Sequence, residues 1–178
     1  MACIIRPMRL DDADDVGCVH VRAWEAAYRG GLMPDTFLDA LSVAERAAMW
    51  SRILRGELPP RTTRLVAESD DGSVVGFGVA GPAVTAAAPE ASNVDAGELF
   101  AINVDPDDWG SMVGTDLLTA AVDALGRAGF TVAHLWVHPD NTRACSFYER
   151  RGWADDGIRR EEDVLGVMVP AVRYSTTL

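Results

Sequence analysis

The fold is decided by residues 98–153, which read ELFAINVDPDDWGSMVGTDLLTAAVDALGRAGFTVAHLWVHPDNTRACSFYERRGW. The stretch opens with a short apolar run of strand length at 98–104, and an Asp-Pro pair ends that run. The turn that follows contains Gly110 and Gly114 and leads into a helical pattern. The first part of the stretch therefore predicts a strand, a glycine-containing turn and a helix.

The helix is followed at once by another strand. Apolar side chains recur at steps of three and four residues over 112–128, and Gly129 ends the pattern. Residues 131–137 are almost continuously apolar, as in a strand buried on both faces. A unit of this length makes a right-handed crossover between parallel neighbours and leaves the helix N-terminus at the carboxyl edge of the sheet. Free N–H groups there favour an anion.

A second helix is predicted beyond this unit. Residues 138–141 turn the chain, and Asp140 or Asn141 can cap a helix whose pattern covers 142–151 and stops at Gly152. The helix carries the pair Phe147 and Tyr148, and it supplies a second wall beside the predicted anion site.

Three blocks of the sequence resemble the GNAT superfamily of acyl-CoA-dependent N-acyltransferases. The most specific block is 141–153, where an Asn and a small residue three positions later precede Phe-Tyr-Glu, two basic residues, Gly and an aromatic. The second block is Glu-Leu-Phe at 98–100 with Val-Asp-Pro at 104–106 and the loop at 109–115. The third is Ile-Arg-Pro at 5–7, Asp-Asp at 11–12 and the helix segment 24–30. The resemblance implies one α/β domain over residues 1–178, with a mixed, mostly antiparallel central sheet flanked by helices.

The loop at 109–114 departs from the pattern of that family. The family reads Gln or Arg, two variable residues, Gly, one variable residue, then Gly or Ala, whereas this chain places Met112 at the first glycine. The usual basic residues are absent, and Asp107 and Asp108 precede the loop, which disfavours a pyrophosphate. Backbone N–H groups remain, and Ser111 and Thr115 add hydroxyl donors. We expect coenzyme binding to survive in weakened form.

The resemblance also implies the residues of an acetyl-CoA site. Tyr148 would donate a proton to the coenzyme sulfur, and the N–H of Val104 would bind the acyl carbonyl, because the family splays this strand before the loop. Acyl transfer also needs a base for the amine, and Glu98, the charged exception in an apolar run, is the candidate, directly or through water. The other expected coenzyme contacts are Ile102, Asn103, Trp109, Gly110, Ser111, Met112, Val113, Gly114, Thr115, Asn141, Ala144 and Phe147.

Each main candidate has an ordinary structural alternative. Glu98 can be a strand-end carboxylate in solvent, Tyr148 can pack beneath its helix, and Asn141 can be only a helix N-cap. Trp24 and Tyr28 can line an acceptor pocket, although aromatic residues four apart on a helix are more often core.

Two further possibilities concern residues outside this set. Trp50 can join Trp24 and Tyr28 in the acceptor pocket. His138 and Cys145 can form a nucleophile pair, but the family has small residues at the position of Cys145, which favours packing.

Composition limits the function. The formal net charge of -11 argues against a nucleic-acid partner and weakly favours a cationic amine substrate, although solubility is the simpler explanation. All 16 basic residues are arginine. The three cysteines show no Cys-x-x-Cys spacing, so we expect neither disulfides nor a structural metal. With no apolar run of membrane-spanning length and no secretion signal, we expect a cytoplasmic protein without a membrane partner.

The remaining segments fit the same fold. Residues 10–28 and 34–54 predict two amphipathic helices, and 64–69 with 74–80 predict a hairpin. Residues 81–97 predict a loop. Residues 158–162 and 165–174 predict antiparallel strands, of which Pro170 makes the last an edge strand. An edge there permits a homodimer.

The sequence thus predicts an N-acetyltransferase that moves an acetyl group from acetyl-CoA to a primary amine of a small molecule or peptide by direct attack. Two alternatives stay open. One is a non-catalytic module that senses acyl-CoA or binds a protein, and the other is an acyltransferase for a longer acyl-CoA.

Overall fold

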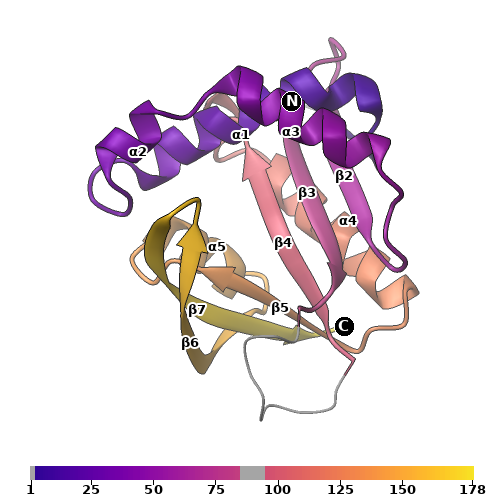
Figure 1. Cartoon of the computed structure of the whole chain (residues 1–178). Coiled ribbons are helices and arrows are strands. Elements are labelled where there is room, and N and C mark those ends of the chain that lie inside the picture. Colours follow the sequence, from indigo (N-terminus) through magenta and orange to yellow (C-terminus); the bar gives the residue numbers. More distant parts are fainter. Residues whose placement is uncertain (1–2, 85–94) are drawn as a thin grey trace.

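The computed structural model describes residues 3–84 and 95–178 (Figure 1). They form one seven-stranded sheet in the order β1-β2-β3-β4-β5-β7-β6. Its strands are β1 (Cys3–Pro7), β2 (Thr63–Ser69), β3 (Val74–Pro82), β4 (Gly97–Val104), β5 (Val132–Val137), β6 (Ala154–Val164) and β7 (Val167–Thr177). Within this sheet β4 and β5 are the parallel pair, and the other neighbours are antiparallel. The predicted mixed, mostly antiparallel sheet is confirmed.

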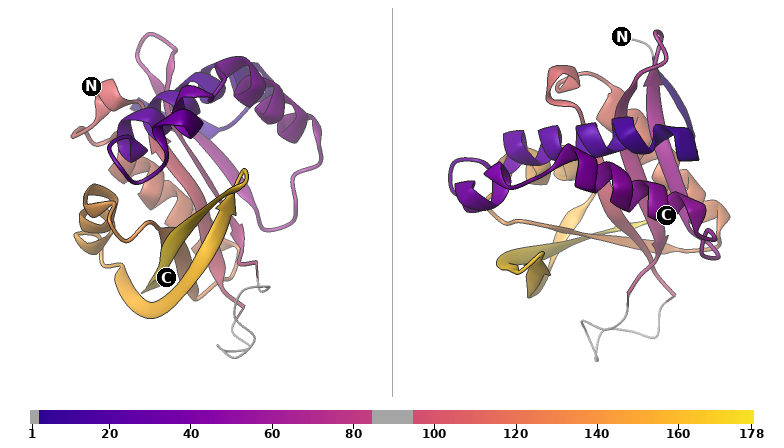
Figure 2. Two further views of the ribbon diagram at one scale, coloured as in Figure 1. Left: turned by 60° about the vertical axis from the view of Figure 1, so that its left-hand side comes forward. Right: turned by 45° about the horizontal axis from the view of Figure 1, so that its top comes forward.

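Helices cover both faces of the sheet (Figure 2). Two short 3₁₀ turns, η1 (Leu10–Asp12) and η3 (Pro106–Asp108), precede or separate the α-helices, which are α1 (Ala13–Tyr28), α2 (Asp35–Asp39), α3 (Val43–Arg55), α4 (Val113–Arg127) and α5 (Thr142–Glu149). The apolar stripe of α4 buries Leu117 and Leu125 against one face. On the other face, Val16 of α1 and Trp50 of α3 pack against Phe77 of β3. The sheet is therefore the common wall of two cores.

The central strands separate after a short contact. β4 and β5 pair over Gly97–Leu99 and Ala133–Leu135, and Figure 1 shows them diverging beyond that point. The register between β3 and β4 passes from Ala80↔Leu99 to Val79↔Ala101, so Phe100 is an extra residue on β4. A bulge of this kind bends the strand that carries it. The gap in the middle of the sheet begins at this bend.

The predicted helix at 34–54 is wrong in one respect, because the structure has two helices there. α2 ends at Asp39, and α3 begins after Ser42, whose hydroxyl oxygen accepts the N–H of Glu45 at 3.3 Å. Serine with this contact is a favoured N-cap, so the capping residue starts a new helix inside the apolar pattern. The helix predicted from residue 10 likewise opens with η1 before α1.

The edge strand predicted at the C-terminus is also corrected. β7 lies between β5 and β6, so β6 is the edge. The pairing of β7 with β5 ends at Val172, and Pro170 lies beyond that end, where β7 has only β6 beside it. Proline has no backbone N–H, but at this position no hydrogen bond to β5 is lost, because β5 does not extend beside it. Of the predicted loop at 81–97, residues 85–94 lie outside the described residues.

Candidate active site

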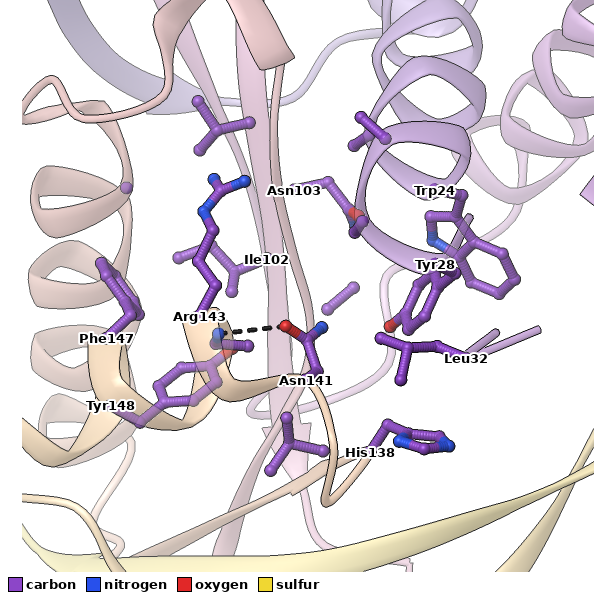
Figure 3. A pocket seen from close by; sticks show the side chains of 18 of the residues that line it. Trp24, Tyr28, Leu32, Ile102, Asn103, His138, Asn141, Arg143, Phe147 and Tyr148 are labelled. Carbon is purple, nitrogen blue, oxygen red and sulfur yellow. Dashed lines mark hydrogen bonds between the residues drawn. The ribbon is translucent and has the colours of Figure 1, made fainter. Parts of the chain in front are cut away.

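A cavity of about 910 Å³ lies where β4 and β5 separate (Figure 3). Its walls come from α1, the second half of β4, the loop before α4, the end of β5, α5 and the β6–β7 hairpin. Because the strands part here, a single space reaches from the aromatic side chains of α1 to the N-terminus of α4.

In the described part of the chain, the edge of β4 presents backbone N–H groups without a partner to this cavity. Asp105 donates its N–H to the carbonyl of Val75 at 2.9 Å, so the facing residues Gly76 and Val104 form a non-hydrogen-bonded pair. The N–H groups of Val104 and Ile102 consequently point away from β3, toward the gap. The Val104 carbonyl accepts the indole N–H of Trp109 at 2.8 Å.

The start of α4 supplies further donors. Among the described residues, the N–H groups of Gly114 and Thr115 have no backbone acceptor. Met112 is the N-cap residue and its side chain is 59% exposed, whereas the Val113 side chain is buried in the core. Neither side chain lines the cavity. Methionine in place of the family glycine is therefore accommodated by pointing outward.

The hydroxyls of Ser111 and Thr115, which were expected to act as donors at the loop, already form hydrogen bonds within the protein. Ser111 donates to the carbonyl of Asp108 at 2.6 Å and accepts the N–H of Val113 at 3.4 Å. The Thr115 hydroxyl accepts a hydrogen bond from Arg151, so its own proton stays available. Thr115 lies outside the cavity lining, while Gly110, Ser111 and Gly114 lie within it.

The acidic residues before the loop are largely neutralised. Arg22 of α1 lies 3.1 Å from a carboxylate oxygen of Asp105 and 2.8 Å from one of Asp107. Asp108 is the member of this group that lines the cavity. The expectation that both Asp107 and Asp108 oppose an anion is therefore corrected for Asp107, because that carboxylate already has a guanidinium partner.

Tyr148 lies in the cavity wall and is 8% exposed. Its ring packs edge-on against Phe147, with 5.2 Å between the ring centroids. Burial, with a smaller contribution from Tyr28 on the opposite wall, raises the pKa of its phenol. The packing predicted as the alternative is thus present together with a cavity-lining position, and the phenol stays protonated at neutral pH.

Asn141 combines the two roles that the sequence left open. Its Oδ1 accepts the N–H of Ala144 at 3.1 Å and caps α5. The residue also lines the cavity beside Ala144 and Phe147, and Figure 3 shows the side-chain amide between α5 and Tyr28. Because the cap requires the oxygen, the NH₂ group is left as a donor.

Glu98 lies outside the lining of the cavity. The side chain is 7% exposed, and its carboxylate accepts the N–H of Val84 at 3.2 Å. Burial raises the pKa of this carboxyl. The expectation of a solvent-exposed strand end is wrong, because the residue is enclosed, and the structure does not bring Glu98 into the same space as Tyr148.

The aromatic end of the cavity contains a residue that the sequence did not single out. His20 lines the cavity with Trp24 and Tyr28, and its Nδ1 accepts the indole N–H of Trp50 at 3.2 Å. Burial, with a contribution from Arg46, lowers the pKa of His20 to about 4. The ring is neutral at pH 7 and its Nε2 carries the proton. The spacing of residues 20, 24 and 28 on one helix face was the available signal.

Trp50 and Cys145 belong to the core. Trp50 is buried beside Phe77 and does not line the cavity, contrary to the suggestion that it joins the acceptor pocket. The Cys145 thiol donates to the backbone carbonyl of His138, not to its ring, and burial raises the pKa of this thiol. This geometry provides no nucleophile pair.

No cluster of three or more His, Cys, Asp or Glu side chains in residues 3–84 and 95–178 is arranged to hold a metal ion. No helix in the same part of the chain has the length and apolar character needed to cross a membrane.

The donors that line the cavity fit an acyl-CoA. Unpaired N–H groups along β4 suit an amide-containing arm, and free N–H groups at the start of α4 suit phosphates. A β-carbon added at Gly114 would lie 3.4 Å from the Phe147 ring and 3.6 Å from Val104. The loop and α5 are therefore in contact range at this end of the cavity.

Comparison with known proteins agrees with this arrangement. The chain is 30% identical over 170 residues to the uncharacterised N-acetyltransferase YuaI of Bacillus subtilis, covering 91% of each protein. It is 29% identical to a mycothiol acetyltransferase of Clavibacter sepedonicus over 83% of this chain and 41% of that protein. The structure of the PaiA N-acetyltransferase of Thermoplasma acidophilum in complex with coenzyme A superposes over the full length of both chains with a TM-score of 0.73 at 19% identity, so the folds agree. The Acetyltransferase (GNAT) family profile matches residues 21–153, and the chain belongs to that family.

Proposed function

We propose that this protein transfers an acetyl group from acetyl-CoA to a primary amine by direct attack of the amine. The observation that carries the proposal is the cavity at the β4–β5 opening, which is lined by the unpaired edge of β4, the loop before α4 and Tyr148. Membership of the family supports the acetyl group as cargo. The coenzyme A in the PaiA complex supports the donor.

The proposed chemistry assigns one task to each group. Acetyl-CoA supplies the acetyl group as a thioester; the amine nitrogen bonds to the thioester carbon, and the carbon–sulfur bond breaks. The Val104 N–H stabilises the carbonyl oxygen as it gains negative charge. Tyr148 gives its proton to the departing thiolate. The proton lost by the amine passes to a base, and Tyr148 is reprotonated from solvent.

Glu98 is the proposed base, acting through water because its carboxylate does not line the cavity. Burial raises the pKa of its carboxyl, which makes the carboxylate a stronger base than an exposed glutamate. Glu162 of β6 is a second carboxylate and does line the cavity. The acidic limb of the kcat/KM profile distinguishes them. If Glu162→Gln abolishes that limb and Glu98→Gln leaves it unchanged, Glu162 replaces Glu98 in the mechanism.

The acceptor is proposed to be a small-molecule or peptide amine that binds at the aromatic end of the cavity. Trp24 and Tyr28 form a wall there, with 5.4 Å between their ring centroids, and Leu32 and Trp136 extend it. Such a wall suits an apolar or cationic body next to the reacting amine. The mycothiol acetyltransferase relative supports including amines related to mycothiol among the candidates.

The test combines binding and turnover. Calorimetric titration with acetyl-CoA measures donor binding, and release of free thiol in the presence of an amine panel measures transfer. The chain has no lysine, so acetyl-lysine detected in a peptide mixture comes from the acceptor alone. Absence of acetyl-CoA binding by the unsubstituted protein would overturn the proposal.

Two alternatives give different outcomes in the same assay. A non-catalytic acyl-CoA-binding module, suggested by Met112 and by Asp108 in the cavity wall, would bind the coenzyme and release no thiol with any amine. An enzyme for a longer acyl group would turn over propionyl-CoA or succinyl-CoA with a higher kcat/KM than acetyl-CoA.

A homodimer is a separate proposal. β6 has one strand neighbour, so its outer edge carries unpaired backbone groups. Its sequence contains Glu161, Glu162 and Asp163, and charges of this kind oppose pairing of two like edges. Sedimentation velocity over a range of concentrations measures whether the protein forms a dimer, which would then use a surface other than the edge of β6.

A further inference from the structure

The loop at 109–114 lacks the basic residue of the family pattern, but α5, which also lines the cavity, carries an arginine. Arg143 lies in the first turn of α5 and lines the cavity. Figure 3 shows its side chain extending away from α5, with Phe147 to one side and Ile102 overlapping it in this view. This direction brings a guanidinium into the gap between α5 and β4, next to Trp109 of the loop.

Trp109 holds this guanidinium in place. The Arg143 Cζ lies 3.0 Å from the centroid of the Trp109 ring, which is a cation–π contact. The indole is itself fixed, because its Nε1–H donates to the Val104 carbonyl at 2.8 Å. Trp109 occupies the position where the family pattern carries Gln or Arg. Trp109 therefore lacks the polar side chain usual at this position, but its ring supports the guanidinium of Arg143.

Among residues 3–84 and 95–178, no carboxylate forms a salt bridge with Arg143. Burial lowers the pKa of its guanidinium. Of the nearby acids, Asp105 and Asp107 are paired with Arg22, and Asp108 forms no salt bridge with Arg143 in the described part of the chain. Arg143 is exposed in the free protein, so its guanidinium is open to an anionic ligand, with which it can form charge-assisted hydrogen bonds.

The same end of the cavity has other groups that suit a phosphate. The free N–H groups of Gly114 and Thr115 lie at the start of α4. The guanidinium of Arg151 packs 3.9 Å from the centroid of the Phe147 ring and donates to the Thr115 hydroxyl. Its Nε is buried and has no acceptor within residues 3–84 and 95–178. Positive charge therefore reaches this helix start from α5 and the residues just after it.

We propose that Arg143, held on the face of Trp109, binds the pyrophosphate of acyl-CoA and takes over the role of the basic residue absent from the loop. The inference rests on the proposed function, since it assumes an acyl-CoA donor. Arginine suits the task because its planar fork makes two parallel hydrogen bonds to a phosphate, and because it stacks on aromatic faces as lysine does not.

Calorimetric titration with acetyl-CoA tests the proposal in the unsubstituted protein, in Arg143→Gln and in Arg127→Gln. Arg127 lies in the last turn of α4, is exposed and does not line the cavity, so its variant removes the same charge elsewhere. Loss of a charge-assisted pair weakens binding about tenfold to a hundredfold in Arg143→Gln. We expect Arg127→Gln to bind as the unsubstituted protein does. Equal affinities of all three proteins, or equal weakening of both variants, would overturn the proposal.

Titration with 3′-dephospho-CoA identifies the phosphate. The effect of Arg143→Gln persists with this probe if the arginine binds the pyrophosphate. If the effect disappears, Arg143 contacts the 3′-phosphate and the assignment is wrong.

Two variants test the platform. Arg143→Lys keeps the charge without the fork or the stacking, so its affinity lies between those of the unsubstituted protein and Arg143→Gln. Trp109→Leu weakens binding when Arg143 is present and has little further effect in the Arg143→Gln background, because coupled residues are non-additive. Additive losses would contradict the platform. Thermal unfolding of each variant confirms that it is folded.

The outcomes separate the two proposals. No binding of acetyl-CoA by the unsubstituted protein sinks the proposed function and this inference with it. Tight binding by the unsubstituted protein together with equally tight binding by Arg143→Gln sinks this inference alone.

Discussion

At the scale of single residues, Tyr148 gives the sharpest test of the chemistry. Tyr148→Phe keeps the ring that packs against Phe147 and removes the proton donor. We expect kcat to fall about 100-fold or more, as for loss of a general acid, while the Kd for acetyl-CoA is unchanged. Normal turnover by the variant would remove the residue from the mechanism.

The pH profile provides a second check on Tyr148. Burial raises the pKa of the phenol above its ordinary value of 10.0, so the acid form persists through neutral and mildly alkaline pH. The kcat of the unsubstituted protein should therefore show no alkaline loss below pH 10 that is absent from Tyr148→Phe. A loss confined to the unsubstituted protein would mean that the phenol titrates earlier than its burial implies.

Glu98 links stability to pH. Because burial raises its pKa in the folded state, folding favours the protonated carboxyl, and the associated stability is lost as pH rises through the folded-state pKa. Glu98→Gln stays neutral and can still accept the Val84 N–H. We expect the variant to be more stable at pH 7, and the advantage to vanish near pH 4, where the carboxyl of the unsubstituted protein is largely protonated in the folded chain. Denaturant titrations at both pH values measure it.

Some site residues could be predicted from the sequence because they lie in short contiguous motifs, whereas others are defined by contacts to residues far away in the sequence. Tyr148, Asn141 and Gly114 lie in contiguous motifs, so sequence alone singled them out. His20 shares the four-residue spacing of Trp24 and Tyr28, but its contact to Trp50, like that of Arg143 to Trp109, joins residues more than 25 positions apart. No local pattern records such contacts, and the same holds for the burial of Glu98 by packing from other strands.

At the scale of elements, Gly76 shows how closely α4 packs on the sheet. A β-carbon at this position would lie 2.9 Å from Leu117 Cδ1 and 3.0 Å from the Asn103 carbonyl oxygen. We expect Gly76→Ala to lower the free energy of unfolding by about 1–3 kcal/mol, because the β4 backbone or α4 must shift. Gly78→Ala is the matched control, since its β-carbon meets only the Ala101 carbonyl, at 3.7 Å. Equal urea midpoints for the two variants would contradict the close approach.

Element identity was largely predictable, and element limits were less so. Periodicity located α1, α4 and α5 and the strands β2 to β5, because each buries one face or both. The break between α2 and α3 depends on one hydrogen bond to Ser42, which an apolar repeat does not reveal. The position of β7 inside the sheet was missed because Pro170 suggested an edge, whereas the proline lies past the end of β5.

At the scale of the whole molecule, the ligand should act as a structural link. The two parts of the sheet meet through the short β4–β5 pairing and face each other across the cavity. Acetyl-CoA at about 100 times its Kd should stabilise the fold by about 2.7 kcal/mol, which raises the Tm by roughly 5–11 °C for a chain of this size. Acetyl phosphate, which lacks the long arm, is the control and should raise the Tm less than acetyl-CoA does. Equal effects of the two ligands would contradict a link across the gap.

The early parting of β4 and β5 has a consequence for amide hydrogen exchange. Slow exchange is normally found at the centre of a sheet and fast exchange at its borders. In this protein the N–H groups of Ile102 and Val104 are central in the strand order and yet unpaired toward the gap. In the free protein these N–H groups should exchange at rates typical of an edge strand. Their exchange should slow markedly when acetyl-CoA is added. The amides of the sheet whose exchange changes most on ligand binding would then lie in its central strand and not at its edges.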